Sequence, residues 1–261
     1  MKIAYIGIDM LFPALQALHD NKAEILKIFT CKTDNITEFN IQICDFAKVH
    51  NIPLQFTRIT LADIYELKEL GCELIVCGGY YYKIPVTDEI PMVNFHPSLL
   101  PYGRGAWPMP LAILNHLTET GITLHKISAG FDEGDIILQR SAEILSNDDL
   151  ESLTNRILSK IPEMVAELLN DFDYLYSNAK PQGYGEYQEC VSEYDYPLSE
   201  NSEYDYADLV LKAFYGYECI YEAPNQKYSL IGGRLFPESE YENGDFKVKN
   251  GIIKAKKVIK L

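Results

Sequence analysis

The sequence predicts an α/β fold: a Rossmann-like, doubly wound and mostly parallel sheet followed by a small C-terminal β module. Through the first two-thirds of the chain, short apolar runs typical of buried strands alternate with helical patterns, which favours a parallel sheet. The last forty-odd residues change to short alternating runs, with Asn250-Gly251 as a hairpin signal. In a doubly wound sheet, ligands lie beyond the carboxyl ends of the strands, so we expect the site there.

Strand and helix patterns alternate in a fixed order. Strands are expected at 2–8, 23–31, 52–57, 72–80, 92–96, 122–127 and 136–139. Helices are expected at 12–20, 40–50, 63–70 and 205–214. Apolar residues spaced by three and four also predict a long helix from Leu150 to Leu168, capped by Asn147 to Asp149 and kinked or broken at Pro162. The polar, tyrosine-rich stretch 171–205 is expected to be an extended, largely exposed connector that is partly packed through its tyrosines.

Composition narrows the function classes. The chain carries 23 basic and 38 acidic residues, a net charge of -15, and such a surface repels phosphate backbones, which disfavours a nucleic-acid partner. No apolar run approaches the roughly 20 residues of a membrane span, and the N-terminus lacks a signal-peptide layout. The six cysteines show no CxxC spacing and no His/Cys cluster has metal-ligand spacing. We therefore expect reduced thiols, no metal, no membrane partner and a cytoplasmic protein.

Two segments carry candidate chemistry: VNFHPSLLPYGRG at 93–105 and FDEGDI at 131–136. Asn94 and His96 alternate at the end of an apolar strand, so both side chains are expected on one face. Asp132 lies in a Gly-flanked loop between two further strands. Taken singly, such residues are most often a turn or edge Asn, a His in a polar contact and a turn-forming Asp. Together, an amide donor, an imidazole and a carboxylate are sufficient to transfer an acyl group to an amine.

Each of the three groups has a chemical role in such a transfer. Asn94 can donate to a carbonyl oxygen that becomes an oxyanion. His96 can donate to the same oxygen when protonated, or accept a proton from the amine when neutral. Asp132 can orient His96, tune its pKa or take the amine proton through a water. His125 lies on a strand near the site, where core packing is favoured over a contact with a substrate.

The sequence resembles the folate-dependent formyltransferases, the family of methionyl-tRNA formyltransferase, glycinamide ribonucleotide formyltransferase and the sugar N-formyltransferases. NFHPSLLP is similar to the family's Asn-x-His-x-Ser-Leu-Leu-Pro motif, and FDEGDII to its Asp-x-Gly motif. RGAWP and TGITLHKI match two further segments of the family. The resemblance implies that Asn94, His96 and Asp132 are the catalytic residues. We therefore expect a catalytic domain over 1–185, a connector over 186–204 and a small helix-plus-hairpin module over 205–261.

The resemblance also implies N10-formyltetrahydrofolate as the formyl donor, a co-substrate. Its pterin is expected against the backbone of the 77–84 and 128–132 loops. The implied cofactor-binding residues are Gly79, Tyr80, Tyr81, Ser98, Leu99, Leu100, Pro101, Ala106, Ser128 and Gly130. The run Tyr80–Tyr82 departs from the family, where smaller or aliphatic residues are common, and ring packing is the expected role of at least two of these tyrosines.

For the acceptor, the favoured interpretation is a nucleotide-linked amino deoxysugar, such as a dTDP-sugar of lipopolysaccharide O-antigen synthesis. The acidic net charge and the short C-terminal module disfavour tRNA, and the resemblance links a small C-terminal piece to the sugar N-formyltransferases. Tyr102, Arg104 and Trp107 are candidate acceptor contacts through stacking or phosphate pairing, and packing within its loop is an equally favoured role for Trp107. Methionyl-tRNA, a carrier-bound amino acid and non-catalytic folate binding stay as alternatives. The C-terminal β segment and the tyrosine-rich connector are also candidate homodimer contacts.

Overall fold

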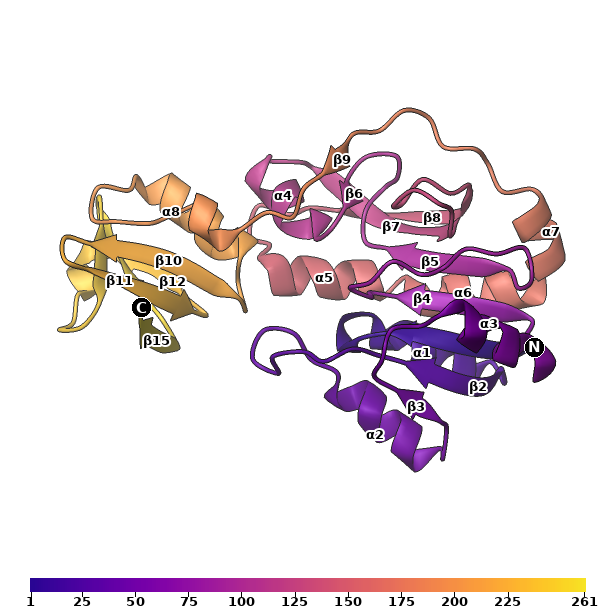
Figure 1. Ribbon diagram of the computed structural model, residues 1–261. Coiled ribbons are helices and arrows are strands. Elements are labelled where there is room, and N and C mark those ends of the chain that lie inside the picture. The colour runs from indigo at the N-terminus through magenta and orange to yellow at the C-terminus, as the bar shows by residue number, and fades with distance from the viewer. The chain divides into compact units, whose positions relative to one another are not determined.

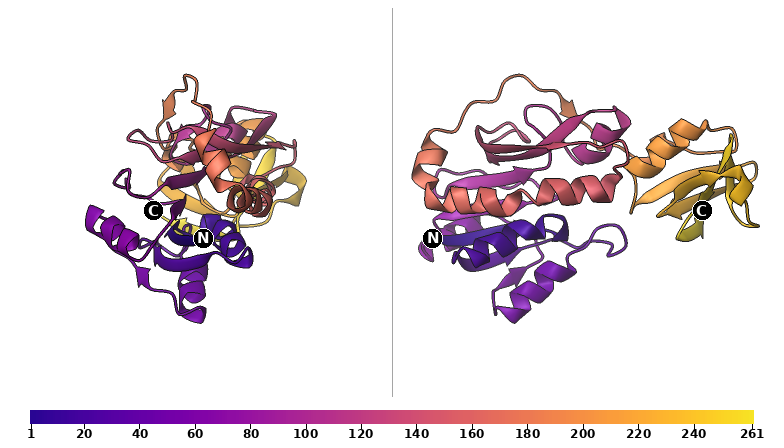
Figure 2. Two further views of the ribbon diagram at one scale, coloured as in Figure 1. Left: turned by 90° about the vertical axis from the view of Figure 1, so that its right-hand side faces the viewer. Right: turned by 180° about the vertical axis from the view of Figure 1, so that it is seen from behind.

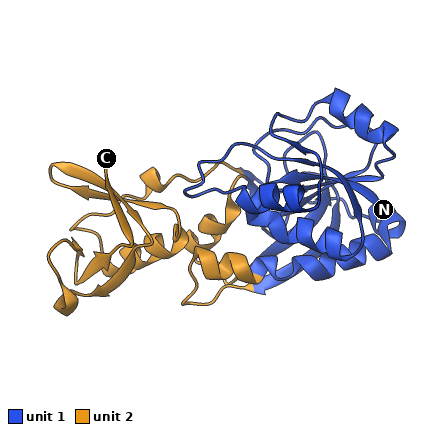
Figure 3. Ribbon diagram, turned by 90° about the horizontal axis from the view of Figure 1, so that it is seen from below, with its two compact units in different colours: residues 1–105, 121–142, 157–187 blue, residues 106–120, 143–156, 188–261 orange.

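The computed structural model describes residues 1–261, and the chain divides into two compact units (Figure 3). Unit 1 comprises residues 1–105, 121–142 and 157–187. Unit 2 comprises residues 106–120, 143–156 and 188–261. The two units interleave along the chain, because two internal segments belong with the C-terminal part. None of the helices is long and apolar enough to cross a membrane.

A seven-stranded sheet forms the centre of unit 1, in the order β3-β2-β1-β4-β5-β7-β8 (Figure 1). Neighbouring strands from β3 to β5 in this order are parallel, whereas β7 is antiparallel to β5. The strands are β1 (Lys2–Gly7), β2 (Glu24–Phe29), β3 (Leu54–Gln55), β4 (Leu74–Gly78), β5 (Met92–His96), β7 (Glu119–Lys126) and β8 (Ile136–Glu143). This mostly parallel sheet, together with the small antiparallel sheets of unit 2, confirms the predicted fold class.

Helices of unit 1 cover both faces of this sheet. They are η1 (Asp9–Leu11), α1 (Phe12–Asp20), α2 (Ile41–Val49), α3 (Leu61–Glu69), α6 (Ile161–Asn170) and α7 (Phe172–Ser177). On one face, Ala4 and Ile6 of β1 pack in a cluster with Ile64 of α3. Tyr5 alternates with them and points to the other face, where its hydroxyl donates to Leu11 O at 2.9 Å. On that face α1 contacts α6, which crosses the right-hand view of Figure 2.

The predicted long helix is two helices, as the proline indicated. α5 (Leu150–Leu158) ends before α6 begins, and Pro162 stands at the second residue of α6. A proline is tolerated in a first turn because the N–H that it lacks would have no partner inside the helix. The predicted cap is also confirmed, since Asp149 Oδ1 accepts from Ser152 N at 2.9 Å.

The expectation that 171–205 is an extended connector is wrong in part. It contains α7, the short η2 (Glu193–Asp195) and β9 (Tyr187–Gln188), which pairs with β6 (Arg104–Gly105). In α7, Phe172 and Tyr176 are four residues apart and their rings lie 5.4 Å apart. Lys126 Nζ lies 4.6 Å over the Tyr176 ring. Phe172 and Tyr176 therefore form the half-buried face of a helix that the polar composition did not reveal, whereas Tyr174 is exposed.

Unit 2 contains α4 (Pro108–Leu114) and α8 (Tyr204–Ala213), which are in contact, together with most of α5 and two small sheets. One sheet has the order β10-β11-β15, with β10 (Glu218–Ala223), β11 (Gln226–Ile231) and β15 (Lys257–Lys260). The other has the order β12-β14-β13, with β12 (Arg234–Pro237), β14 (Gly251–Lys254) and β13 (Phe246–Val248). The short η3 (Glu238–Glu240) follows β12.

The predicted C-terminal hairpin forms, but its turn lies one residue earlier than Asn250-Gly251. Val248 of β13 pairs with Gly251 of β14, so Lys249 and Asn250 make the two-residue turn. Asn250 has φ of 60°, the left-handed conformation that asparagine tolerates better than most residues. Gly251 is therefore the first residue of the returning strand.

Candidate active site

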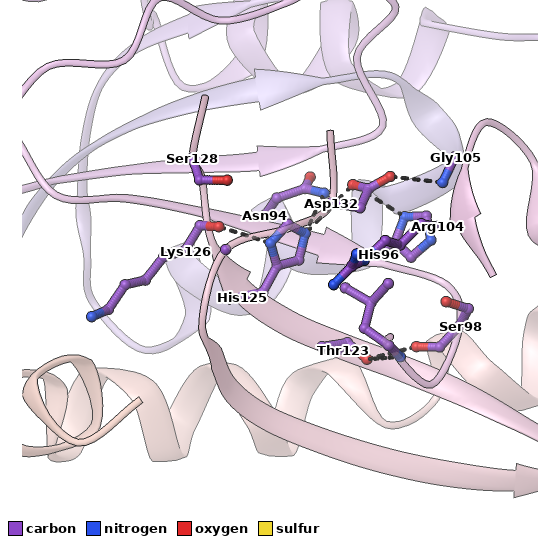
Figure 4. A network of polar contacts seen from close by, with 12 residues as sticks. Asn94, His96, Ser98, Arg104, Gly105, Thr123, His125, Lys126, Ser128 and Asp132 are labelled. Carbon is purple, nitrogen blue, oxygen red and sulfur yellow. Dashed lines mark hydrogen bonds and ion pairs between the residues drawn. The ribbon is translucent and has the colours of Figure 1, made fainter. Parts of the chain in front are cut away.

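The three predicted catalytic residues lie together in unit 1 (Figure 4). Asn94 and His96 are on β5, at the carboxyl end of the parallel part of the sheet. Asp132 lies in the loop between β7 and β8, with a backbone φ of 54°. Across the antiparallel β5–β7 pair, Asn94 stands opposite His125. Residues directly opposite in a sheet share a face, so this register brings a second imidazole to the site.

His96 is buried and its two ring nitrogens have different partners. Nε2 lies 2.7 Å from Gly103 O, so Nε2 carries a proton and donates to that carbonyl. Nδ1 therefore faces Asp132 Oδ1, at 3.6 Å. Burial lowers the pKa of His96, and the Asp132 carboxylate offsets part of that effect. Nδ1 is thus a proton-accepting position beside a carboxylate that stabilises the imidazolium.

Asp132 is held by contacts to both of its carboxylate oxygens. Oδ2 accepts from Gly105 N at 3.0 Å. Oδ1 lies 3.6 Å from His96 Nδ1 and 3.6 Å from His125 Nε2. Burial acts to raise the pKa of Asp132, but the contacts with His125, His96 and Gly105 N together lower it. The side chain is therefore a carboxylate near neutral pH.

His125 is a further residue of the candidate site, and the sequence analysis favoured core packing for it. It is buried, as core packing implies, but its Nδ1 lies 2.8 Å from Lys126 O and its Nε2 lies 3.1 Å from Asn94 Nδ2. Because a carbonyl can only accept, Nδ1 carries a proton, and in this tautomer Nε2 accepts from Asn94 Nδ2. His125 thereby fixes which way the Asn94 amide points and leaves its second N–H free. The signal that could have found it is the strand register that places His125 opposite Asn94.

The loop after β5 is tied down from β7 and β8. Thr123 Oγ1 donates to Ser98 O at 2.6 Å and accepts from Leu100 N at 3.1 Å. Gln139 Nε2 donates to Leu100 O at 2.7 Å, and Ser98 Oγ donates to Tyr102 O at 2.8 Å. The Leu100–Pro101 peptide is cis. The backbone of this loop, which includes Leu99, is thus fixed beside His96.

The other expected cofactor residues occupy two further loops and one position in unit 2. Gly79 adopts φ of 69°, and Tyr80 Oη accepts from Ile59 N at 3.3 Å. The Tyr80 and Tyr82 rings pack edge-on at 5.4 Å, whereas Tyr81 is half exposed. Ser128 Oγ donates to Gly130 O at 3.2 Å within its own loop. Ala106 belongs to unit 2.

The three expected acceptor contacts are not brought together within one unit. Tyr102 is 78% exposed in unit 1. The Arg104 guanidinium is buried in unit 1, where it donates to Gln182 Oε1 and to the carbonyl oxygens of Gly183 and Gly185. These partners occupy Arg104 inside the fold. Trp107 is in unit 2, where its ring lies 4.6 Å from that of Tyr217, and its buried Nε1 has no hydrogen-bond partner.

This geometry supports chemistry at a carbonyl carbon. A free amide N–H, two imidazoles and one carboxylate converge from β5, β7 and the loop after β7 (Figure 4). Such a set can stabilise a developing oxyanion and accept a proton from a nucleophile. No group of three or more His, Cys, Asp and Glu side chains has an arrangement that could hold a metal ion.

The chain matches the family model described as formyl transferase over residues 45–169. It is 34% identical to methionyl-tRNA formyltransferase of Ehrlichia ruminantium (strain Gardel) over 164 residues, which cover 60% of this chain and 54% of that protein. The match thus spans about half the length of that relative. It is 28% identical to methionyl-tRNA formyltransferase of Ehrlichia chaffeensis (strain ATCC CRL-10679 / Arkansas), covering 97% of this chain and 90% of that protein.

Among solved structures, the fold is similar to that of WlaRD, a sugar 3N-formyl transferase, with a TM-score of 0.67 and 20% identity. That similarity covers 100% of this chain and 98% of the WlaRD chain, and at this identity it concerns the fold. The matching family model, the aligned relatives and the paired motifs on β5 and in the loop after β7 agree with one another. The chain thus contains a formyl transferase domain over residues 45–169 and is similar to methionyl-tRNA formyltransferases.

Proposed function

We propose that this protein is an N-formyltransferase that moves a formyl group from N10-formyltetrahydrofolate to the amine of a nucleotide-linked amino deoxysugar. The observation that carries the proposal is the convergence of Asn94, His96 and Asp132 at the end of β5. Bound formyl-folate supplies an electrophilic formyl carbon. The donor set fits that group, because an amide N–H and an imidazole are suited to a carbonyl oxygen that gains negative charge.

The protein side chains then have separate tasks. Asn94 donates its free N–H to the formyl oxygen, while its other N–H stays on His125 Nε2. His96 Nδ1 takes the proton of the attacking amine as the new bond to the formyl carbon forms, and the Asp132 carboxylate 3.6 Å away stabilises the resulting imidazolium. His96 returns this proton to the folate N10 as the bond between N10 and the formyl carbon breaks, so that tetrahydrofolate can leave. Because burial lowers the pKa of His96, the ring is neutral and ready to accept that proton at neutral pH.

The loops beside these side chains would hold the folate. Gly79 to Tyr81 follow β4, Ser98 to Pro101 follow β5, and Ser128 to Gly130 follow β7. Backbone N–H and C=O groups in such loops can pair with a pterin ring, because the ring carries amide-like hydrogen-bond donors and acceptors. Gly79 in its left-handed conformation leaves this backbone uncovered by a Cβ.

A nucleotide sugar as acceptor is supported by the charge of the chain and by one structural neighbour. A net charge of -15 disfavours a long phosphate backbone but allows a small anionic substrate that needs only a few local donors. The neighbour WlaRD was solved in the presence of dTDP and 5-N-formyl-tetrahydrofolate. Tyr102 and Trp107 stay as proposed stacking contacts, whereas Arg104 is already occupied by Gln182 and two carbonyl oxygens.

Methionyl-tRNA is the second candidate acceptor, because the relative from Ehrlichia chaffeensis carries that name and aligns with nearly the whole chain. Six lysines without an acidic residue also lie between 247 and 261. Two of them are paired within unit 2, Lys249 with Glu203 and Lys254 with Glu242 at 3.4 Å. These pairs reduce the positive charge that the module offers to a phosphate backbone.

The test measures release of tetrahydrofolate by absorbance. The acceptors are nucleotide-linked 3-amino and 4-amino deoxysugars, methionyl-tRNA and an amino acid on a carrier protein. Turnover with one sugar and not with tRNA supports the proposal, and turnover with tRNA alone selects the second candidate. Folate binding without turnover on any acceptor would contradict both and favour a non-catalytic folate-binding protein. Light scattering at the assay concentration tests the proposed homodimer.

A further inference from the structure

After α7, residues 178–187 form a strap that leads back toward the loops of the candidate active site. The strap is anchored to β8 by two backbone hydrogen bonds between Lys180 and Ile136, both of 2.8 Å. Two residues later it places the amide of Gln182 beside the loop that carries Asp132. Both of these hydrogen bonds join backbone groups. The sheet therefore helps to fix the position of Gln182, in addition to the contacts of the Gln182 side chain.

Gln182 uses every hydrogen-bonding position of its amide. Nε2 donates to Asp132 O at 2.9 Å and to Gly134 O at 2.6 Å. Oε1 accepts from Arg104 Nε at 3.1 Å and from Arg104 Nη2 at 2.8 Å. An amide has two N–H groups and two lone pairs, so no capacity is left. Such a saturated, part-buried amide is a rigid connector between two loops.

The Asp132 backbone is the part of the site that needs such a connector. Its φ of 54° is a left-handed conformation, which costs free energy in a residue with a side chain. Gln182 holds the Asp132 carbonyl, and Gly105 N holds the Asp132 carboxylate through Oδ2 at 3.0 Å. Gly105 directly follows Arg104, the residue that fixes Gln182. One connected network therefore fixes both ends of Asp132.

We propose that Gln182 is a positioning residue for the proposed catalytic carboxylate: its two Nε2 hydrogen bonds hold the Asp132 loop in the conformation that places Oδ1 beside His96. The inference rests on the proposed function for its effect on turnover. Its effect on the placement of Asp132 is independent of any activity.

Two substitutions separate positioning from simple structural support. Gln182→Glu keeps an oxygen for Arg104 but removes both N–H donors and sets a carboxylate against the carbonyl oxygens of Asp132 and Gly134. Gln182→Leu removes every hydrogen bond. If Gln182 positions Asp132, both variants lose about 10- to 100-fold in kcat, because displacements near 1 Å have effects of this size, while KM for the formyl donor changes little. If Gln182 serves only to accept hydrogen bonds from Arg104, Gln182→Glu keeps the parent kcat, and the proposal is overturned.

The matched control is Gln226→Leu in unit 2. Gln226 Nε2 also donates to two carbonyl oxygens, those of Lys227 and Leu261, at 2.7 and 2.6 Å. It has no contact with the proposed catalytic residues, so the parent kcat is expected. Thermal unfolding of all three variants is recorded, and only those that unfold cooperatively are compared.

A second readout does not need turnover. The Asp132 charge raises the pKa of His96 against the effect of burial, while His125 from β7 acts in the opposite direction. Displacing Asp132 therefore lowers the midpoint of the His96 titration, followed by NMR of its ring C–H signals. A lowered midpoint in both Gln182 variants supports the positioning role even if the parent protein transfers no formyl group. An unchanged midpoint in both variants contradicts it, whatever the outcome for the proposed function.

Discussion

Replacing Asn94 by alanine tests the proposed oxyanion donor. Asn94 Nδ2 has two N–H groups, and one of them donates to His125 Nε2 at 3.1 Å. A single N–H therefore remains for the formyl oxygen. The loss of one such donor costs about 100- to 1,000-fold in kcat, or about 2.7–4 kcal/mol of transition-state stabilisation. KM for the formyl donor should change little, because this hydrogen bond strengthens only as the oxyanion develops.

The same substitution has a predicted structural cost. His125 Nε2 is left without its Asn94 donor in a buried ring, which lowers the free energy of unfolding by about 1–3 kcal/mol. Steady-state kinetics and urea unfolding measure the two effects. The control is Asn21→Ala, which removes a comparable hydrogen bond from Nδ2 to Ala17 O at 2.9 Å and should keep the parent kcat. A kcat within about threefold of the parent in Asn94→Ala, far below the loss expected for a donor, would refute the reasoning.

Three further predictions concern stability. His96 binds a proton less readily in the folded than in the unfolded state, so the free energy of unfolding should fall as the pH drops below about 6.5, and His96→Gln should reduce this slope in urea titrations. Arg156→Met leaves the buried Asp148 carboxylate without its bidentate partner, and the free energy of unfolding should fall by about 2 kcal/mol. An unchanged denaturation midpoint would contradict this prediction. Asn250→Val forces a β-branched residue into φ of 60° and should cost about 1–2 kcal/mol, while Asn250→Gly should be tolerated in the same thermal melts.

The core strands could be predicted from sequence because a buried parallel strand leaves a simple pattern. Lys2–Gly7 and Leu74–Gly78 are apolar on both faces and are recognised as short continuous runs. Pro162 likewise marks the helix break through its own covalent geometry. α7 was missed because its packing depends on Lys126, 50 residues earlier in the chain, which no local pattern reveals.

In the candidate site too, some features could be predicted from the sequence and others could not. Asn94 and His96 are two residues apart on one strand, so their shared face follows from the pleat alone. The role of His125 depends on the register between β5 and β7, and that of Gln182 on a bridge between Lys180 and Ile136. Register is set by tertiary packing, so these contacts could not be derived from spacing. Arg104 is a candidate acceptor contact by its sequence context alone, because the buried partners of its guanidinium lie about 80 residues away in the chain.

The most direct test of the proposed function is tetrahydrofolate release with a panel of nucleotide-linked amino deoxysugars, compared between the parent protein and Asn94→Ala. If the proposed function is correct, one sugar is turned over, its N-formyl product is detected by mass spectrometry, and turnover falls about 100- to 1,000-fold in the variant. Formyl-folate binding with no product from any sugar, tRNA or carrier-bound amine would contradict the central claim.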